Sequence, residues 1–125
     1  MTAIRVLVAE DSQVYRHTLV AVLELEDDLQ VVAALASGDR IVPVARVLAP
    51  DVAVLDLDLP GVDGLAAAAA LRAALPACRV LILTGLAVAG IEPRVRACGA
   101  AGYLSKAASA ADIVAVVRRI AGGRA

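Results

Sequence analysis

Four carboxylates stand where apolar segments of the sequence end. Glu10 and Asp11 directly follow the first such segment, and Asp56 closes a later one, with Asp58 two residues further on. Carboxylates that converge raise one another's pKa by about a unit or more unless a cation neutralises them. Because oxygen ligands without Cys or His suit Mg²⁺, the sequence predicts a magnesium site formed by Glu10, Asp11, Asp56 and Asp58.

A hydroxyl and an ammonium group follow two further apolar segments. Thr84 ends one of them, and Lys106, the single lysine among 12 cationic residues, comes just after the other. An ammonium is a compact charge suited to one phosphoryl oxygen, and a hydroxyl can donate to another. A carboxylate flanked by a metal, an ammonium and a hydroxyl can attack an electrophilic phosphorus. The predicted catalytic residues are therefore Asp56, Lys106 and Thr84.

Each of these residues also has an ordinary structural interpretation when it is taken alone. Glu10 and Asp11 can be first-turn acids that favour a helix dipole. Asp58 can be a solvated loop residue, and Thr84 or Lys106 alone indicates little. Because a carboxylate at the end of an apolar strand is uncommon, Asp56 is the least ambiguous, and the joint placement carries the prediction.

The elements that must position these residues can be read from hydrophobic periodicity. Apolar segments alternate with helical patterns five times, which is typical of an α/β protein with a parallel sheet and helices on both faces. Ligands bind such sheets at the carboxyl ends of the strands, where the six residues above fall. The predicted strands are 4–9, 30–35, 52–56, 79–84 and 101–104, and the predicted helices are 12–26, 39–48, 64–75, 92–98 and 109–121.

Composition narrows the class of protein. The 125 residues, 61% hydrophobic and 2% aromatic, predict one domain over 1–125. A net charge of −1 offers no basic field for nucleic acid or an anionic membrane. Apolar runs are too short to span a bilayer, and the first one carries Arg5 and meets Glu10-Asp11, so no signal peptide is readable and we expect a cytoplasmic protein. One histidine, and two cysteines without metal-ligand spacing, disfavour His or Cys metal clusters.

Four motifs together resemble a known family. They are Glu10-Asp11, the stretch D-L-D-L-P-G-V-D-G over 56–64, Thr84-Gly85, and Tyr103-Leu104-Ser105-Lys106. This set is similar to the receiver domain of two-component response regulators, and the resemblance covers essentially the whole chain. It implies a flavodoxin-like (βα)5 fold with strand order 2-1-3-4-5.

The resemblance also implies a role for each site residue. Asp56 would be the phospho-acceptor, and Mg²⁺ would be held by Glu10, Asp11, Asp56 and the backbone carbonyl of Asp58. Lys106 would contact the phosphoryl group. Thr84 and Tyr103 would be the switch residues, although the Tyr103 ring can also simply cover apolar surface near the sheet edge.

The implied activity is signalling by phosphoryl transfer rather than enzymatic turnover. A partner histidine kinase would phosphorylate Asp56, and the resulting phosphoaspartate would then hydrolyse slowly. The face formed by helix 92–98, strand 101–104 and helix 109–121 would change and promote homodimerisation. The dimer surface stays open between that face and the first and last helices.

The run over 102–106 and the closing residues 118–122 look more like the NarL/FixJ-type subfamily. Its members usually continue into a C-terminal helix-turn-helix that binds DNA and regulates transcription. No output domain is present in this chain, so DNA binding would need a missing segment. We expect a domain cut from a longer regulator, with a stand-alone receiver as the alternative.

Two departures from the family pattern carry expectations of their own. Ala107 stands where relatives often have a cis proline, which leaves the geometry around Lys106 open. Asp58 places a carboxylate where many relatives have an uncharged side chain. We expect Asp58 to change metal affinity or the lifetime of the phosphorylated state, in a direction that the sequence leaves open.

Three other classes of protein remain as alternatives. A pseudo-receiver that only binds protein is disfavoured by the complete acidic set and Lys106. A haloacid-dehalogenase-type phosphatase shares the order of Asp56, Asp58, Thr84 and Lys106, but it needs acids after its lysine, where only Asp112 follows. Flavin binding is disfavoured because the loops offer little aromatic surface for stacking.

Overall fold

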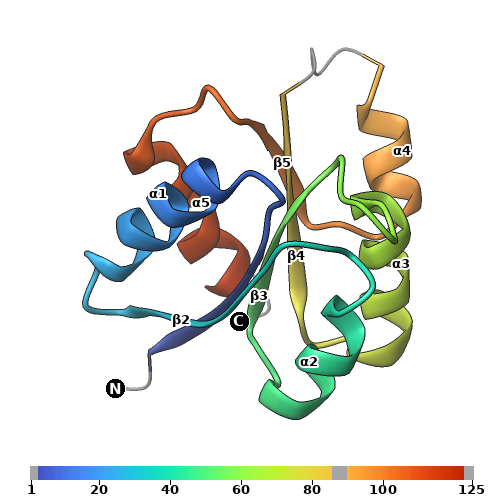
Figure 1. The fold of residues 1–125 in the computed structure, drawn as a ribbon, viewed down its shortest axis with the longest axis horizontal. Helices are drawn as coiled ribbons and strands as arrows, with labels where there is room; N and C mark the ends of the chain where they lie inside the picture. Colours follow the sequence, from blue (N-terminus) through green and yellow to red (C-terminus); the bar gives the residue numbers. More distant parts are fainter. Residues whose placement is uncertain (1–2, 86–89, 123–125) are drawn as a thin grey trace.

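Five parallel strands form one sheet in the order β2-β1-β3-β4-β5 (Figure 1). The structure is a computed structural model that describes residues 3–85 and 90–122. The predicted flavodoxin-like order is therefore confirmed, and β1 lies between β2 and β3. The strands are β1 Ile4–Ala9, β2 Leu29–Leu35, β3 Val52–Asp56, β4 Arg79–Thr84 and β5 Gly102–Ser105.

Helices cover both faces of the sheet, as predicted. Figure 1 shows α1 and α5 on one face and α2, α3 and α4 on the other. Within the described residues, no helix combines the length and the apolar character needed to cross a bilayer. The helices are α1 Gln13–Glu24, α2 Ile41–Leu48, α3 Gly64–Ala74, α4 Glu92–Ala97 and α5 Ala110–Gly122.

The predicted bounds are correct for β1, β3 and β4 and differ by one or two residues elsewhere. Capping explains two of the differences, because a serine that caps a helix lies just outside it. Ser12 Oγ accepts a hydrogen bond from the Tyr15 N–H at 3.3 Å, and Ser109 Oγ accepts one from the Asp112 N–H at 3.1 Å. At the start of α2, residues 39–40 form a turn, so the helix begins two residues later than predicted.

Other bounds move because the backbone changes direction. Leu75 leaves the helical region with φ −139°, so α3 ends at Ala74. The edge strand β2 begins one residue earlier than predicted and ends where predicted, and β5 is shifted by one residue. The sequence also predicts a loose stretch before Gly90 and a domain boundary after Gly122, and both segments lie largely outside the described residues, at 86–89 and 123–125.

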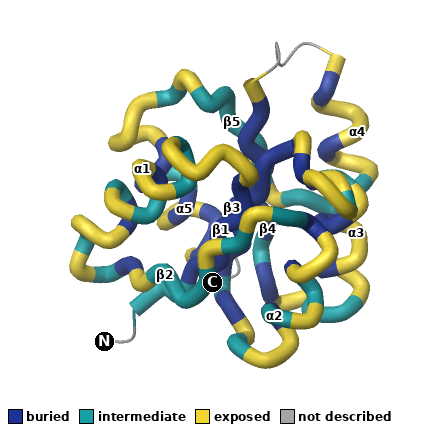
Figure 2. Tube along the Cα trace, viewed as in Figure 1, coloured by how far each residue is buried: buried dark blue, intermediate teal, exposed yellow. Residues whose placement is uncertain are grey.

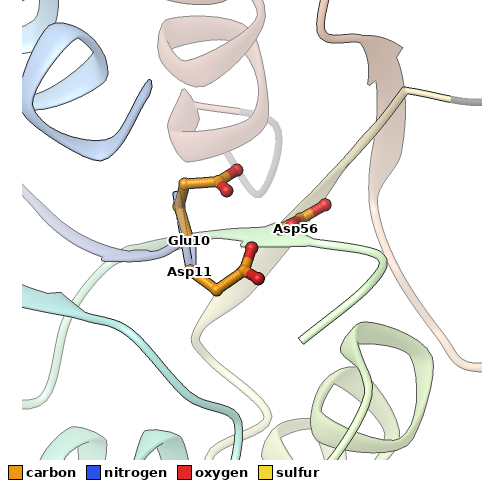
Figure 3. A group of neighbouring side chains, drawn as sticks. All are labelled: Glu10, Asp11 and Asp56. Atoms are coloured by element: carbon orange, nitrogen blue, oxygen red, sulfur yellow. The ribbon is translucent and has the colours of Figure 1, made fainter. Parts of the chain in front are cut away.

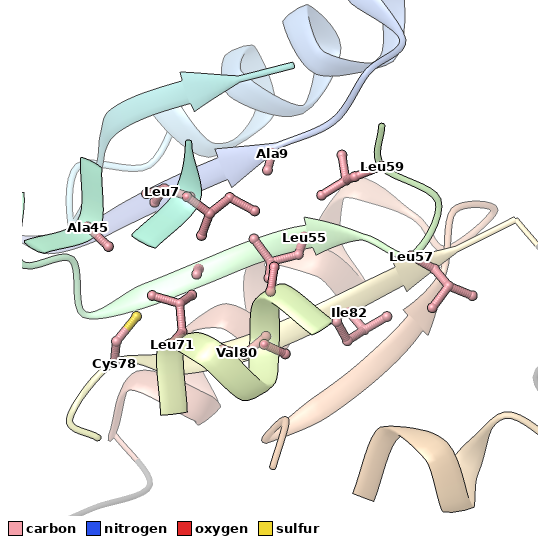
Figure 4. Packing of buried hydrophobic residues seen from close by; sticks show 14 of the residues in the cluster. Leu7, Ala9, Ala45, Leu55, Leu57, Leu59, Leu71, Cys78, Val80 and Ile82 are labelled. Carbon is pink, nitrogen blue, oxygen red and sulfur yellow. The ribbon is translucent and has the colours of Figure 1, made fainter. Parts of the chain in front are cut away.

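Alternation along the strands divides the core into two layers, since successive side chains point to opposite faces. On β1, Val6 and Val8 pack with α1 and α5, whereas Leu7 and Ala9 pack with α2 and α3. Figure 2 shows the central strands buried beneath helices whose outer surfaces are exposed. The layer under α2 and α3 appears in Figure 4. Burial on both faces explains why most residues of these strands are apolar.

The alanine-rich helix α3 packs closely on the sheet with its smallest residues. The pattern of Leu65, Leu71 and Leu75 predicts an amphipathic helix. Ala67, Ala68 and Leu71 are buried, whereas Leu65 and Leu75 are only half-buried. A Cβ added to Gly64 would lie 2.3 Å from the Asp56 carbonyl oxygen. The start of α3 therefore rests directly on the peptide that carries the predicted phospho-acceptor.

Candidate functional site

Three carboxylates meet at the carboxyl edge of the sheet, at the ends of β1 and β3 (Figure 3). Glu10, Asp11 and Asp56 each offer an oxygen, and these oxygens lie within 4.8 Å of one another. Glu10 is 1% exposed and Asp56 4%, while Asp11 is exposed to solvent. The strand order predicted from the sequence brings together the acids that it was expected to bring together.

The backbone at this edge is held by hydrogen bonds between neighbouring strands. The Glu10 N–H donates to the Leu35 carbonyl at 2.9 Å, and the Leu57 N–H donates to the Leu83 carbonyl at 2.8 Å. The Lys106 N–H donates to the Thr84 carbonyl at 2.9 Å. Because rigid strand ends carry them, the functional side chains leave the sheet from defined positions.

Glu10 has three different neighbours, all of them donors or cations. The Ser12 N–H donates to Oε2 at 2.9 Å, and Arg16 Nη1 donates to the Glu10 backbone carbonyl at 2.8 Å. The other carboxylate oxygen, Oε1, is buried. It meets Lys106 Nζ at 2.7 Å as an ion pair. A second cation that binds this oxygen would therefore have to compete with the Lys106 ammonium.

The Lys106 ammonium bridges two of the three acids. Nζ lies 3.2 Å from Asp56 Oδ2, in addition to the contact with Glu10. Burial acts to lower the pKa of Lys106, but the Glu10 and Asp56 carboxylates outweigh burial and raise the pKa overall. Lys106 therefore stays charged at neutral pH, and it is the cation that the sequence predicted beside Asp56.

The surroundings of Asp56 favour its carboxylate as a nucleophile. Burial, followed by the neighbouring Glu10 charge, raises its pKa to about 6, while Lys106 and the Asp58 N–H oppose the rise. That N–H donates to Asp56 Oδ1 at 3.3 Å. At neutral pH the carboxylate is largely ionised and poorly solvated, which suits a nucleophile.

The donor set fits a hard divalent cation. Three carboxylates against one ammonium leave the cluster with an excess of negative charge, and each carboxylate offers an oxygen ligand. Among the described residues, Asp58 is not part of this acidic cluster, and its side chain is exposed. The side chain of Asp58 as a metal ligand stays a prediction, whereas Glu10, Asp11 and Asp56 lie together as expected.

The two predicted switch residues lie on neighbouring strands. Thr84 is fully buried at the end of β4 and pairs in register with Ser105 on β5. Tyr103 lies on β5 and packs partly against the core layer of α2 and α3. Its hydroxyl donates to Glu92 Oε2 on α4 at 2.9 Å. The ring thus covers apolar surface, as one interpretation of the sequence holds, and its switch role stays a prediction.

The loop after Lys106 takes a form that the sequence left open. Within the described residues no peptide bond is cis, so Ala107 follows Lys106 through a trans bond. Ser105 shapes the turn, because its Oγ accepts a hydrogen bond from the Ala107 N–H at 3.0 Å and its carbonyl accepts one from the Ala108 N–H at 3.0 Å.

Sequence reasoning missed the residues that support the site from α1. In the sequence, Tyr15 fits only the apolar stripe of its helix, with Leu19, Val22 and Leu23. In the structure, its ring centroid lies 5.0 Å from Lys106 Nζ. Arg16 supports the Glu10 backbone and was not singled out. Their position in the first turn of the helix after Glu10 was the available signal, since that turn must face the site.

The raised pKa of Asp56 predicts how the stability of the metal-free domain changes with pH. The folded domain keeps this proton up to about pH 6, whereas the unfolded chain releases it near 3.8. Stability therefore falls as the pH rises between these values, and the ionised carboxylate opposes folding at neutral pH. We expect Asp56→Asn to raise the free energy of unfolding at neutral pH by about 1–2 kcal/mol.

Urea unfolding in the presence of a chelator, repeated across the acidic and neutral range, measures this effect. Asp58→Asn removes an exposed carboxylate outside the cluster and is the matched control, for which we expect the parent's pH profile. Equal stability of the parent and Asp56→Asn at neutral pH would contradict the prediction.

Comparison with known proteins agrees with this geometry. A family model of the response regulator receiver domain matches residues 6–118. The signal receiver domain of the response regulator NarL from Mycobacterium tuberculosis has a solved structure that superposes with a TM-score of 0.94 at 33% identity. That match covers 99% of this chain and 100% of the other.

Two curated relatives are longer than this chain. The transcriptional regulatory protein DesR of Bacillus subtilis (strain 168) is 33% identical over 97% of the chain, which spans 60% of DesR. The protein-glutamate methylesterase/protein-glutamine glutaminase 2 of Anaeromyxobacter dehalogenans (strain 2CP-C) is 37% identical over 88% of the chain. The match spans 32% of that protein, so both relatives contain further segments beyond the part that matches this chain.

Proposed function

The chain belongs to the response regulator receiver domain family of two-component signalling, and from this premise we propose that Asp56 accepts a phosphoryl group from a histidine kinase. The observation that carries the proposal is the surroundings of Asp56. Its buried carboxylate lies beside two further acids and 3.2 Å from the Lys106 ammonium. A structural aspartate would not need this set of neighbours.

In the proposed reaction, an Asp56 carboxylate oxygen attacks the phosphorus of the kinase's phosphohistidine. A P–O bond forms, the P–N bond breaks, and the electron pair returns to the imidazole nitrogen. Slow hydrolysis then restores the carboxylate, as water bonds to phosphorus and inorganic phosphate leaves. The chain acts as a signalling protein with slow self-catalysed steps, not as a turnover enzyme.

Residues of the site have separate roles in this reaction. Lys106, already 3.2 Å from Asp56 Oδ2, would neutralise a phosphoryl oxygen as negative charge arrives. Thr84, buried at the next strand end, would donate its hydroxyl to another oxygen. Glu10, Asp11 and Asp56 would hold Mg²⁺ together with the Asp58 carbonyl. When bound, Mg²⁺ supplies positive charge that screens the acids from the phosphoryl oxygens.

We propose that phosphorylation of Asp56 changes the shape of one face of the domain. Attraction of Thr84 toward the phosphoryl group would free space for Tyr103, whose hydroxyl is held by Glu92 of α4. The face formed by α4, β5 and α5 would then change and favour a homodimer. The dimer surface can be this face or the one formed by α1 and α5, and α5 belongs to both.

The output domain is proposed from the relatives. DesR is a transcriptional regulatory protein, and the NarL domain is a solved neighbour, so a C-terminal DNA-binding domain fits best. The methylesterase relative shows that a segment similar to this chain can also belong to a protein named for another activity. We propose transcription regulation by a cytoplasmic regulator within a phosphorelay.

One experiment tests the phosphoryl transfer. Parent and Asp56→Asn are incubated with Mg²⁺ and acetyl phosphate, and intact masses are measured. We expect one phosphoryl group per parent chain, stable in acid and labile in base, and none on the variant. Continuous phosphate release over many turnovers would indicate a phosphatase, and no adduct on the parent would indicate a pseudo-receiver.

A further inference from the structure

The hydrogen bonds of its own loop do not fix the direction of the Lys106 side chain. Hydrogen bonds to Thr84 and Ser105 hold the loop backbone, but the ammonium lies at the end of a flexible four-carbon chain. A pocket of about 110 Å³ borders the lysine between α1 and the loop after β5. Because close packing does not enclose Lys106, its direction depends on specific contacts.

Tyr15 supplies such contacts at both ends of the lysine. Its ring centroid lies 5.0 Å from Lys106 Nζ, within the range of a cation–π interaction. Its hydroxyl lies 3.5 Å from the Lys106 backbone carbonyl and donates a long hydrogen bond to it. The ring is half-buried, which strengthens its attraction for the ammonium relative to a fully solvated pair.

The position of Tyr15 is itself fixed by the site. Its N–H donates to Ser12 Oγ at the start of α1, and the Ser12 N–H donates to Glu10 Oε2. The segment from Glu10 to Tyr15 therefore carries both an acid that attracts the ammonium and a ring that orients it. These contacts join two parts of the chain that are 91 residues apart.

We propose that Tyr15 is a positioning residue that holds the Lys106 ammonium within the acidic cluster. The inference rests on the proposed function and deepens it. The ring keeps the ammonium beside Asp56, where it is needed during phosphoryl transfer, and at the same time the ammonium competes with Mg²⁺ for Glu10 and Asp56. Loss of the ring therefore has two opposite consequences.

The test compares Tyr15→Leu with Tyr15→Phe, each in the parent and in a Lys106→Met background. Calorimetry measures Mg²⁺ affinity after chelator treatment, and mass spectrometry measures the phosphorylation rate with acetyl phosphate at saturating Mg²⁺. We expect Tyr15→Leu to bind Mg²⁺ about two- to fivefold more tightly and to be phosphorylated about three- to tenfold more slowly. Tyr15→Phe keeps the ring and should stay within about twofold of the parent.

The opposite directions separate positioning from a general structural role. A loosened domain would lose both Mg²⁺ affinity and rate, and that result in a folded Tyr15→Leu would overturn the inference. So would an effect of Tyr15→Leu that persists undiminished when Lys106 is Met, or values equal to those of the parent. If the parent itself forms no adduct, the proposed function fails, while the Mg²⁺ measurements still decide whether Tyr15 acts through Lys106.

Discussion

Lys106→Met should bind Mg²⁺ more tightly than the parent and yet accept a phosphoryl group about 100-fold more slowly. The ammonium now lies 2.7 Å from Glu10 Oε1 and 3.2 Å from Asp56 Oδ2, so a cation that enters must compete with it. Its removal should raise Mg²⁺ affinity by about three- to tenfold. The same removal leaves the arriving phosphoryl charge unneutralised. Calorimetry and the rate of adduct formation measure the two effects.

Two variants serve as controls for this result. Arg118→Met also removes a cation that pairs with two acids, Glu26 and Asp28. This group lies at the amino-terminal end of the strands, away from the site, where the Ile4 N–H donates to the Asp28 carbonyl. It should leave both measurements unchanged. Lys106→Arg keeps the charge but replaces a point contact by a planar fork. Normal switching in Lys106→Arg, or weaker Mg²⁺ binding in Lys106→Met, would contradict the proposed role.

Gly64→Ala should destabilise the domain by about 2–3 kcal/mol, although alanine is the better helix former. The added Cβ would lie 2.3 Å from the Asp56 carbonyl oxygen and 2.9 Å from Leu57 Cα. Both are backbone atoms of a central strand end, so no side-chain rotation relieves the clash. The start of α3 or the Asp56 peptide must move, and we expect Mg²⁺ affinity to fall with stability. Urea unfolding and calorimetry measure both.

Gly122→Ala is the matched control, because a Cβ at that position meets nothing within 4 Å. We expect its stability to equal or slightly exceed that of the parent, since alanine favours the helix. If Gly64→Ala were as stable as Gly122→Ala, α3 would not rest on the Asp56 peptide as closely as the structure indicates.

The fold was largely predictable because its signals are local. Strands that are buried on both faces must be apolar, so β1, β3 and β4 could be bounded to the residue. Helix starts were less certain, because a capping residue such as Ser12 has the chemistry of a helix start but lies outside the helix. The edge strands β2 and β5 lack this continuous burial; the predicted start of β2 was one residue late, and both bounds of β5 were displaced by one residue.

The sequence predicted which residues form the candidate site better than it predicted the contacts that they make. Glu10, Asp11 and Asp56 were expected to meet because parallel strands end at one edge, and their oxygens do lie together. The exposed side chain of Asp58 was expected in the same cluster, yet it lies outside the acidic group found among the described residues. Residue spacing places an aspartate in the loop, but the turn decides which way its side chain points.

By itself, then, the sequence determined the alternation of elements, the carboxyl edge as the site, and the acids and single lysine that gather there. These features follow from periodicity and from the chemistry of each residue type. Only the tertiary structure decided that Lys106 Nζ lies between Glu10 and Asp56, that the Tyr15 ring centroid lies 5.0 Å from it, and that Gly64 lets α3 rest on the Asp56 peptide. Such contacts join residues far apart in the chain, and their distances depend on strand register and loop conformation, which no local pattern specifies.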